Sequence, residues 1–243
     1  VVELFDPTTG SFTATVSMRL PRQGHTASLL PSGQVLVIGR NNSDNSLLTV
    51  NSVSYNASRT TEIYTPAVGN TAATWTDGPV MTYGRDSHAV TLINATSSNF
   101  LLVTGGYSYN GGGDKAELLD VTSTLSSTFS SNPLWATTSS PMSVSRALQT
   151  STLVSDAGVV KVLVIGGYNA TSQMLKSTEL FTLNATTPAS STWSTTGNKE
   201  LTLARAMHTS TLLSNGNVLV LGTYYSTTGT VSNTTEIWTP AAP

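Results

Sequence analysis

The chain of 243 residues contains no cysteine. This absence excludes disulfides, thiol catalysis, thiolate-bound zinc and iron–sulfur clusters. It leaves the cellular compartment open, because a domain of this size buries enough surface to be stable without disulfides.

Charged residues are scarce, at 10 % of the chain with a formal net charge of -2, against about 25 % in an average protein. The clustered lysines and arginines that neutralise phosphates are missing, so we expect no nucleic-acid partner. No apolar run approaches the roughly 18 residues of a membrane span, and we expect none. The chain opens at Val1 without a signal-like segment, which predicts a mature or partial chain.

Serine, threonine and asparagine are abundant, and they form acceptor sequences for N-glycosylation. A surface with few charges needs another source of hydration, which glycans would supply. The sequence therefore predicts a secreted or cell-surface, extracellular protein with covalent N-glycans. The six Asn-x-Ser/Thr acceptors are Asn41, Asn56, Asn94, Asn169, Asn184 and Asn233.

An internal repeat runs through the whole chain. Each copy begins with an alternating strand, followed by a short turn and a continuous apolar strand that ends at glycine. These hairpins are predicted near 25–39, 88–106, 149–167 and 208–222. Each copy has an arginine before the hairpin, a glutamate that heads the third strand and an aromatic residue on the outermost strand. The arginines are Arg22, Arg85, Arg146 and Arg205, the glutamates Glu62, Glu117, Glu179 and Glu236, and the aromatics Phe12, Trp75, Trp135 and Trp193.

This repeat resembles the kelch repeat of β-propellers, and its wording is similar to that of the galactose-oxidase-like kelch proteins. The resemblance covers essentially the whole chain and implies one all-β domain over 1–243, with four recognisable blades of four antiparallel strands. Three departures stand out: Gln149 replaces a histidine, Phe12 replaces a tryptophan, and the second glycine is missing after Gly39 and Gly222.

The number of blades is open to two interpretations. An extra glutamate strand at Glu3 gives five such strands for four hairpins, so the chain begins and ends in the same phase of the repeat. We favour a closed four-bladed ring in which the first strands complete the last blade. The alternative is a segment of a larger ring or array. One strand is left over in the ring, and an exposed edge of this kind predicts self-association or pairing with other protein chains.

The arginines and glutamates of the repeat are interpreted as buried structural partners, since an unpaired buried charge is costly. Tyrosines on the loops that follow the second strands are the candidate ligand contacts, because these loops share one face. They are Tyr107, Tyr109, Tyr168, Tyr224 and Tyr225.

Enzymatic activity is not expected. Copper-radical oxidation, which the resemblance raises, rests on a tyrosine cross-linked to cysteine, and the chain has no cysteine. All three histidines occupy the repeat position beside arginine, no Gly-x-Ser-x-Gly motif is present, and no cofactor or metal is predicted. The leading hypothesis is a structural or interaction module, as in an extracellular fibre or matrix. The alternatives are a carbohydrate-binding module and an inactive relative of the copper-radical oxidases.

Overall fold

The structure is a computed structural model that describes residues 1–41, 46–50, 53–108, 111–125, 134–197, 199–225 and 230–242. The described part is built from β-strands, with two short 3-10 turns, η1 (Ala57–Arg59) and η2 (Pro188–Ser190). Within it, no helix has the length and apolar character that crossing a membrane requires.

The strands form four main antiparallel sheets, which follow one another along the chain. Sheet 1 contains β3 (Thr26–Leu29), β4 (Val35–Ile38), β7 (Thr61–Thr65) and β8 (Thr74–Asp77). Sheet 2 contains β10 (Ala89–Asn94), β11 (Asn99–Thr104), β13 (Ala116–Asp120) and β14 (Trp135–Thr137). Sheet 3 contains β15 (Thr150–Asp156), β16 (Val159–Ile165), β17 (Thr178–Thr182) and β18 (Thr192–Thr195). Sheet 4 contains β19 (Thr209–Leu212), β20 (Val218–Tyr225) and β21 (Thr230–Trp238).

Three two-stranded sheets complete the described strands. They pair β1 (Val2–Asp6) with β2 (Ser11–Thr15), β5 (Leu47–Val50) with β6 (Val53–Asn56), and β9 (Arg85–Asp86) with β12 (Tyr107–Ser108). The all-β prediction is confirmed. Sheets 1 to 3 have the four antiparallel strands predicted for each blade, whereas sheet 4 has three among the described residues.

The hydrophobic core lies between neighbouring sheets. The second strands of sheets 1 to 3 are largely apolar and most of their residues are buried between neighbouring sheets, as the sequence predicts. One cluster joins sheets 1 and 2 through residues such as Ile38 and Leu101. A second joins sheets 2 and 3 through Leu102 and Val164, and a third joins sheets 3 and 4 around Leu163. Each sheet is therefore held mainly by the sheets beside it.

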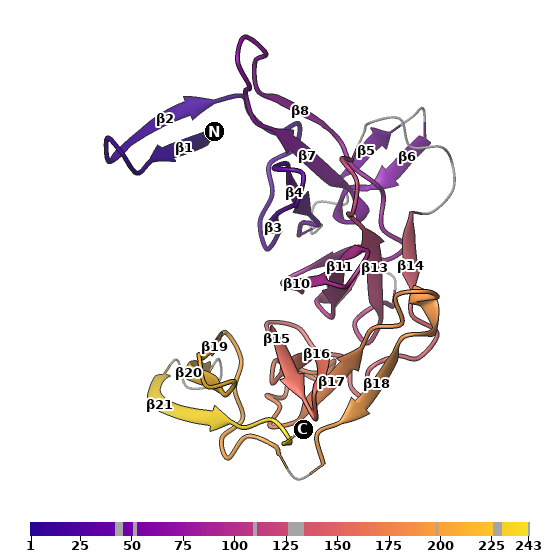
Figure 1. The fold of residues 1–243 in the computed structure, drawn as a ribbon, viewed down its shortest axis with the longest axis vertical. Helices are drawn as coiled ribbons and strands as arrows, with labels where there is room; N and C mark the ends of the chain where they lie inside the picture. The colour runs from indigo at the N-terminus through magenta and orange to yellow at the C-terminus, as the bar shows by residue number, and fades with distance from the viewer. Residues whose placement is uncertain are drawn as a thin grey trace.

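The four sheets fan out along an open arc, with β3, β10, β15 and β19 on its inner side (Figure 1). The arrangement is compatible with a β-propeller-like fold. It differs from the favoured four-bladed ring, because β1–β2 forms a sheet of its own and does not pair with the described strands of sheet 4. The strand β2, which would complete sheet 4 in such a ring, pairs instead with β1, from Val2 opposite Thr15 to Asp6 opposite Ser11.

Two segments expected as loops contain strands. The segment 223–234 largely extends the hairpin of sheet 4, since β20 reaches Tyr225 and β21 begins at Thr230. The segment 40–60 contains the hairpin β5–β6 and the turn η1. Segment 223–234 is rich in the β-branched and aromatic residues that favour strands.

Candidate functional site

Each main sheet contains one ion pair between the arginine and the glutamate of the repeat. The nitrogen–oxygen distances are 2.8 Å for Arg22–Glu62, 2.9 Å for Arg85–Glu117, 2.8 Å for Arg146–Glu179 and 3.0 Å for Arg205–Glu236. Each guanidinium also donates to the carbonyl of the glycine that ends the second strand, as Arg85 does to Gly105 at 2.6 Å. The arginine thus ties the second strand to the third within one sheet.

The glutamates also accept hydrogen bonds from the backbone of the connection that leads into each sheet. Backbone amides donate to them, such as Thr82 to Glu117 at 2.7 Å and Ser143 to Glu179 at 2.8 Å. Burial lowers the pKa of the Arg85 guanidinium, and the carboxylate of Glu117 partly offsets this effect. Each of the four carboxylates is thus bound both by a guanidinium and by backbone amides.

His88 and His208 lie at junctions between sheets and are neutral. Burial lowers the pKa of His88 to about 3 and that of His208 to about 4, and the neighbouring arginine lowers it further in each case. Each ring meets a threonine of the previous sheet through Nε2, and Nδ1 has no hydrogen-bond partner. No three His, Cys, Asp or Glu side chains gather as metal ligands within the described ranges.

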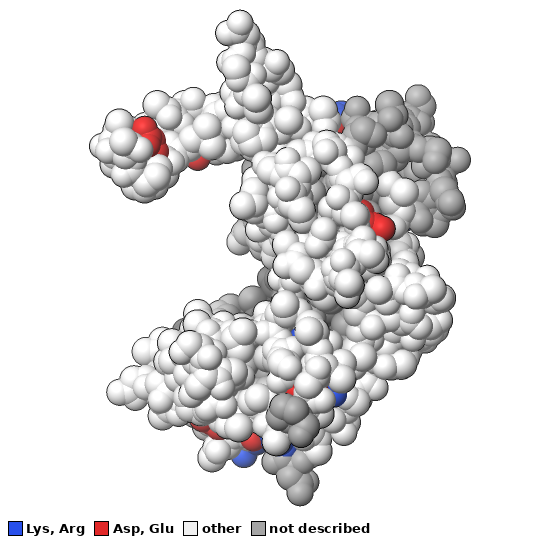
Figure 2. All heavy atoms as spheres, in the orientation of Figure 1, with Lys and Arg blue, Asp and Glu red and all other residues white. Residues whose placement is uncertain are grey.

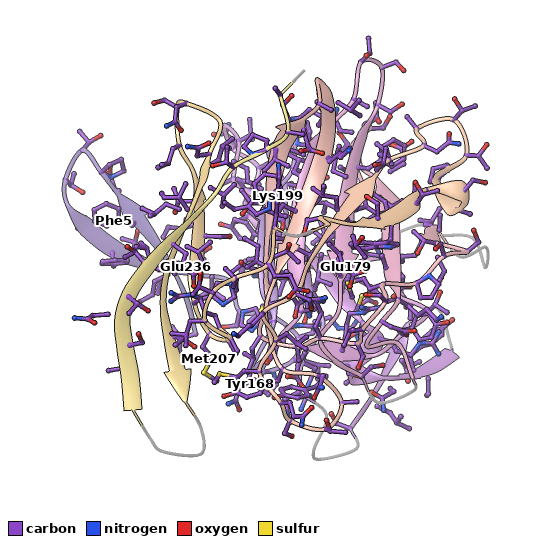
Figure 3. All side chains as sticks on the ribbon, turned by 90° about the horizontal axis from the view of Figure 1, so that it is seen from below. Phe5, Tyr168, Glu179, Lys199, Met207 and Glu236 are labelled. Atoms are coloured by element: carbon purple, nitrogen blue, oxygen red, sulfur yellow. The ribbon has the colours of Figure 1, made fainter. Side chains whose placement is uncertain are left out.

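A cavity of about 370 Å³ opens between sheets 2 and 3. It lies where the chain leaves the second strands, and Tyr168 marks this end of the molecule in Figure 3. Its volume falls in the range of small-molecule sites. The lining residues with side-chain polar groups are Tyr107, Ser108, Asp114, Ser145, Arg146, Tyr168, Asn169 and Ser172.

The two tyrosines of the cavity differ in their surroundings. Tyr107 on β12 is 46 % exposed, whereas Tyr168 is 6 % exposed and its backbone bridges to Ala147 in both directions. Partial burial raises the pKa of Tyr107, with Tyr168 and Asp86 adding to the effect. Tyr107 therefore stays a neutral phenol that presents a ring and a hydroxyl to solvent.

The structure brings together only part of the predicted tyrosine set. Tyr107 and Tyr168 line one cavity, as their shared face predicted. Tyr109 lies outside the described residues. Tyr224 and Tyr225 are the last two residues of β20, and their side chains lie outside the described part of the structure.

Among the described residues that line the cavity, Asp114 is the single carboxylate, and its Oδ2 lies 3.5 Å from the Lys115 ammonium. Glycoside hydrolysis takes two carboxyl groups facing one bond, and the lining does not provide them. Ser145 and Ser172 were not singled out from the sequence, because only the packing of sheet 2 on sheet 3 brings them to Tyr107.

The six glycosylation acceptors differ in accessibility. Asn94, Asn184 and Asn233 are exposed, whereas Asn41, Asn56 and Asn169 are half-buried. Asn41 donates to Asp86 through Nδ2 at 3.3 Å. Asn169 lines the cavity, and its Oδ1 accepts from the Thr171 amide at 3.0 Å and hydroxyl at 2.9 Å.

A scan against models of known protein families finds no match for this chain, and a search of curated proteins finds no match either.

Proposed function

We propose that the chain is a kelch-type β-propeller module of an extracellular glycoprotein, whose role is structural or is to bind other proteins. The observation that carries this proposal is the use of charge. Four of the eleven basic residues and four of the thirteen acidic residues form ion pairs inside the sheets. The face in Figure 2 is almost without charge, with a few scattered acidic and basic atoms.

Such a surface needs hydration that ions do not supply. Exposed asparagines in three acceptor sequences offer places for glycans: Asn94 at the end of β10, Asn184 after β17 and Asn233 in β21. At Asn184, Oδ1 accepts hydrogen bonds from the amides of Thr186 and Thr187, which holds the acceptor in an exposed turn. A glycan on Nδ2 would extend into solvent there.

The test is the mass of the native protein before and after enzymatic removal of N-glycans. We expect a mass above that of the polypeptide, which falls on treatment. Thr186→Ala should remove one glycan and leave Asn184 in place, while the matched change Thr192→Ala on β18 should leave the mass of attached glycan unchanged. A native protein with the mass of the bare polypeptide would contradict the proposal.

Carbohydrate binding is the second candidate, and the cavity between sheets 2 and 3 favours it. Sugars present apolar C–H faces and hydroxyls, which suit an exposed aromatic ring beside polar groups. Tyr107 offers the ring, and Asp114 and Asn169 lie on the same lining. Because Asn169 is also an acceptor sequence, a glycan attached there would stand at the cavity.

A glycan array followed by calorimetry tests this candidate. We expect Tyr107→Ala to abolish binding of any sugar that the array identifies. Phe12→Ala is the matched control, since Phe12 is 66 % exposed on β2 and does not line the cavity. Equal losses in both variants, or an array without a hit, would rule out a sugar site at Tyr107.

A further inference from the structure

Neighbouring sheets meet through a backbone contact that recurs at three junctions. In the connection before each inner strand, an amide donates to the equivalent carbonyl of the previous sheet. These bonds run from Ser87 to Gly24 at 2.7 Å, from Leu148 to Ser87 at 2.9 Å and from Met207 to Leu148 at 3.0 Å. All four residues have positive φ, between +53° and +67°, so the connections share one conformation.

Side chains of the inner strands repeat across the same junctions. His88 Nε2 lies 2.9 Å from the Thr26 hydroxyl, and His208 Nε2 lies 3.0 Å from the Thr150 hydroxyl. Further along the strands, two hydroxyl pairs at 2.6 Å join neighbouring sheets. They are Thr91 with Ser151 and Thr152 with Ser210.

The glycine that ends each second strand completes the junction. A Cβ on Gly39, Gly105 or Gly166 would collide with the carbonyl oxygen of the arginine that opens the next sheet. Gly222 in sheet 4 has the same backbone conformation, with φ +68°, but its nearest neighbour to such a Cβ is the Ser232 carbonyl at 3.5 Å. The place occupied by the next sheet elsewhere is open beside Gly222.

The two ends of the arc expose the two halves of this junction. At the first end of the arc, His25, Ala27 and Leu29 of sheet 1 are exposed. His25 holds the repeat position that His88 and His208 hold in later sheets, where the side chain is buried. At the other end, Thr209 and Thr211 are exposed in the positions of Thr150 and Thr152. Met207 is 55 % exposed and stands at the same end of the molecule as Tyr168 in Figure 3.

We propose that a second copy of the chain docks head to tail on this arc, with sheet 1 of one copy packed on sheet 4 of the other. In that contact His25 meets Thr209, the Gly24 amide donates to the Met207 carbonyl, and the backbone at Arg22 covers Gly222. A second copy is the occupant because it continues an interface that this chain already builds three times, and because it carries both missing halves.

The hairpin β1–β2 gains a partner surface in the same arrangement. In sheets 1 to 3 the fourth strand directly precedes the connection to the next sheet, and β2 holds that place before β3. Sheet 4 has no fourth strand among its described residues, so the hairpin of the incoming copy arrives at the free edge of β21. Phe5 and Phe12, with ring centroids 5.0 Å apart, and Ile237 supply exposed apolar surface there.

The contact is heterologous, because each copy uses a different surface at each end. Such contacts close into a ring when the rotation allows it and otherwise grow into a filament. The inference does not depend on glycosylation, so loss of the proposed function and loss of the contact are separate outcomes.

Cysteine cross-linking tests the register of the contact, since the chain has no cysteine of its own. Thr211 and Ala27 correspond to the pairs whose hydroxyls lie 2.6 Å apart inside the chain, a separation that suits a disulfide after substitution. A mixture of the Thr211→Cys and Ala27→Cys chains should form a covalent pair of twice the chain mass under mild oxidation. The matched mixture of Thr192→Cys with Ala27→Cys should cross-link at least tenfold more slowly, because Thr192 is exposed on the outer strand β18.

Light scattering across a range of concentrations tests the association itself. We expect the full chain to exceed its monomer mass as concentration rises, and Thr209→Lys to return it to the monomer while Thr192→Lys does not. Both side chains are exposed in the single chain, so folding should be retained. A monomer at all concentrations, or equal cross-linking in both cysteine mixtures, would overturn the proposal.

Discussion

The buried histidines predict that acidification destabilises the fold between about pH 7 and pH 5. His88 and His208 are each 5 % exposed. Protonation would place a second N–H at Nδ1, where neither ring has a hydrogen-bond partner, next to an arginine of the same repeat. The folded protein therefore holds both rings neutral, while the unfolded chain takes up protons near the ordinary histidine pKa of 6.5.

The sign and the size of the effect follow from proton linkage. Since the unfolded state binds more protons below that value, stability is complete above about pH 6.5 and falls as the pH decreases toward the folded pKa. With a folded pKa of about 3 for His88, each pH unit costs about 1.4 kcal/mol, or about 2 kcal/mol at about pH 5. His208, with a folded pKa of about 4, should add a similar loss.

The chain itself suggests the control variant. Gln149 stands at the same repeat position, is 6 % exposed and donates through Nε2 to the Thr104 carbonyl at 2.8 Å. The double change His88→Gln and His208→Gln should therefore fold at neutral pH and remove the proton uptake of these two side chains. Urea unfolding at a series of pH values measures the free energy of unfolding. Between neutral pH and about pH 5, we expect this free energy to fall by about 4 kcal/mol more in the wild type than in the variant. Parallel losses in the two proteins would refute the reasoning.

Three further predictions concern the interior. Arg146→Met should destabilise the fold by about 3–5 kcal/mol because it leaves Glu179 buried without its cation, and urea unfolding should show a smaller loss when Glu179→Leu is added. Gly105→Ala should lower the melting temperature far more than Gly10→Ala, because both glycines have positive φ but only a Cβ at Gly105 would collide with a carbonyl oxygen. We expect Gly10→Ala to cost about 1–2 kcal/mol. Similar melting shifts in the two variants would contradict this reasoning. Leu163→Ala should cost about 2–5 kcal/mol, because Leu163 is fully buried between sheets 3 and 4, and a calorimetric loss below that range would indicate a loosely packed junction.

The sequence predicts the sheets well because each type of strand recurs at least four times along the chain. The apolar strand that ends at glycine and the shared spacing of Arg146 and Glu179 were enough to place the hairpins and to interpret the charges as partners. The structure does not show the favoured closed ring, whereas an open arc is compatible with the alternative of a segment of a larger ring or array. The positive φ of Leu148 and Met207 was not predicted, because nothing in leucine or methionine indicates a left-handed connection.

The sequence predicted a shared face for the loop tyrosines and did not predict a cavity. The position of Tyr107 and Tyr168 after second strands indicated a common face, but their shared lining with Ser145 depends on how two sheets pack. The pattern of residues along one strand does not indicate how one sheet packs on the next.

Because the core lies between the sheets and not within them, cooperativity passes along the chain from neighbour to neighbour. Sheets 2 and 3 are supported on both sides, whereas sheets 1 and 4 each have one such support in the single chain. Partial unfolding should therefore start at the two termini and move inward, as in other repeat proteins. Amide hydrogen exchange would then be slowest in β11 and β16 and fastest in β2 and β21, which gives the molecule a durable centre and two ends that open readily.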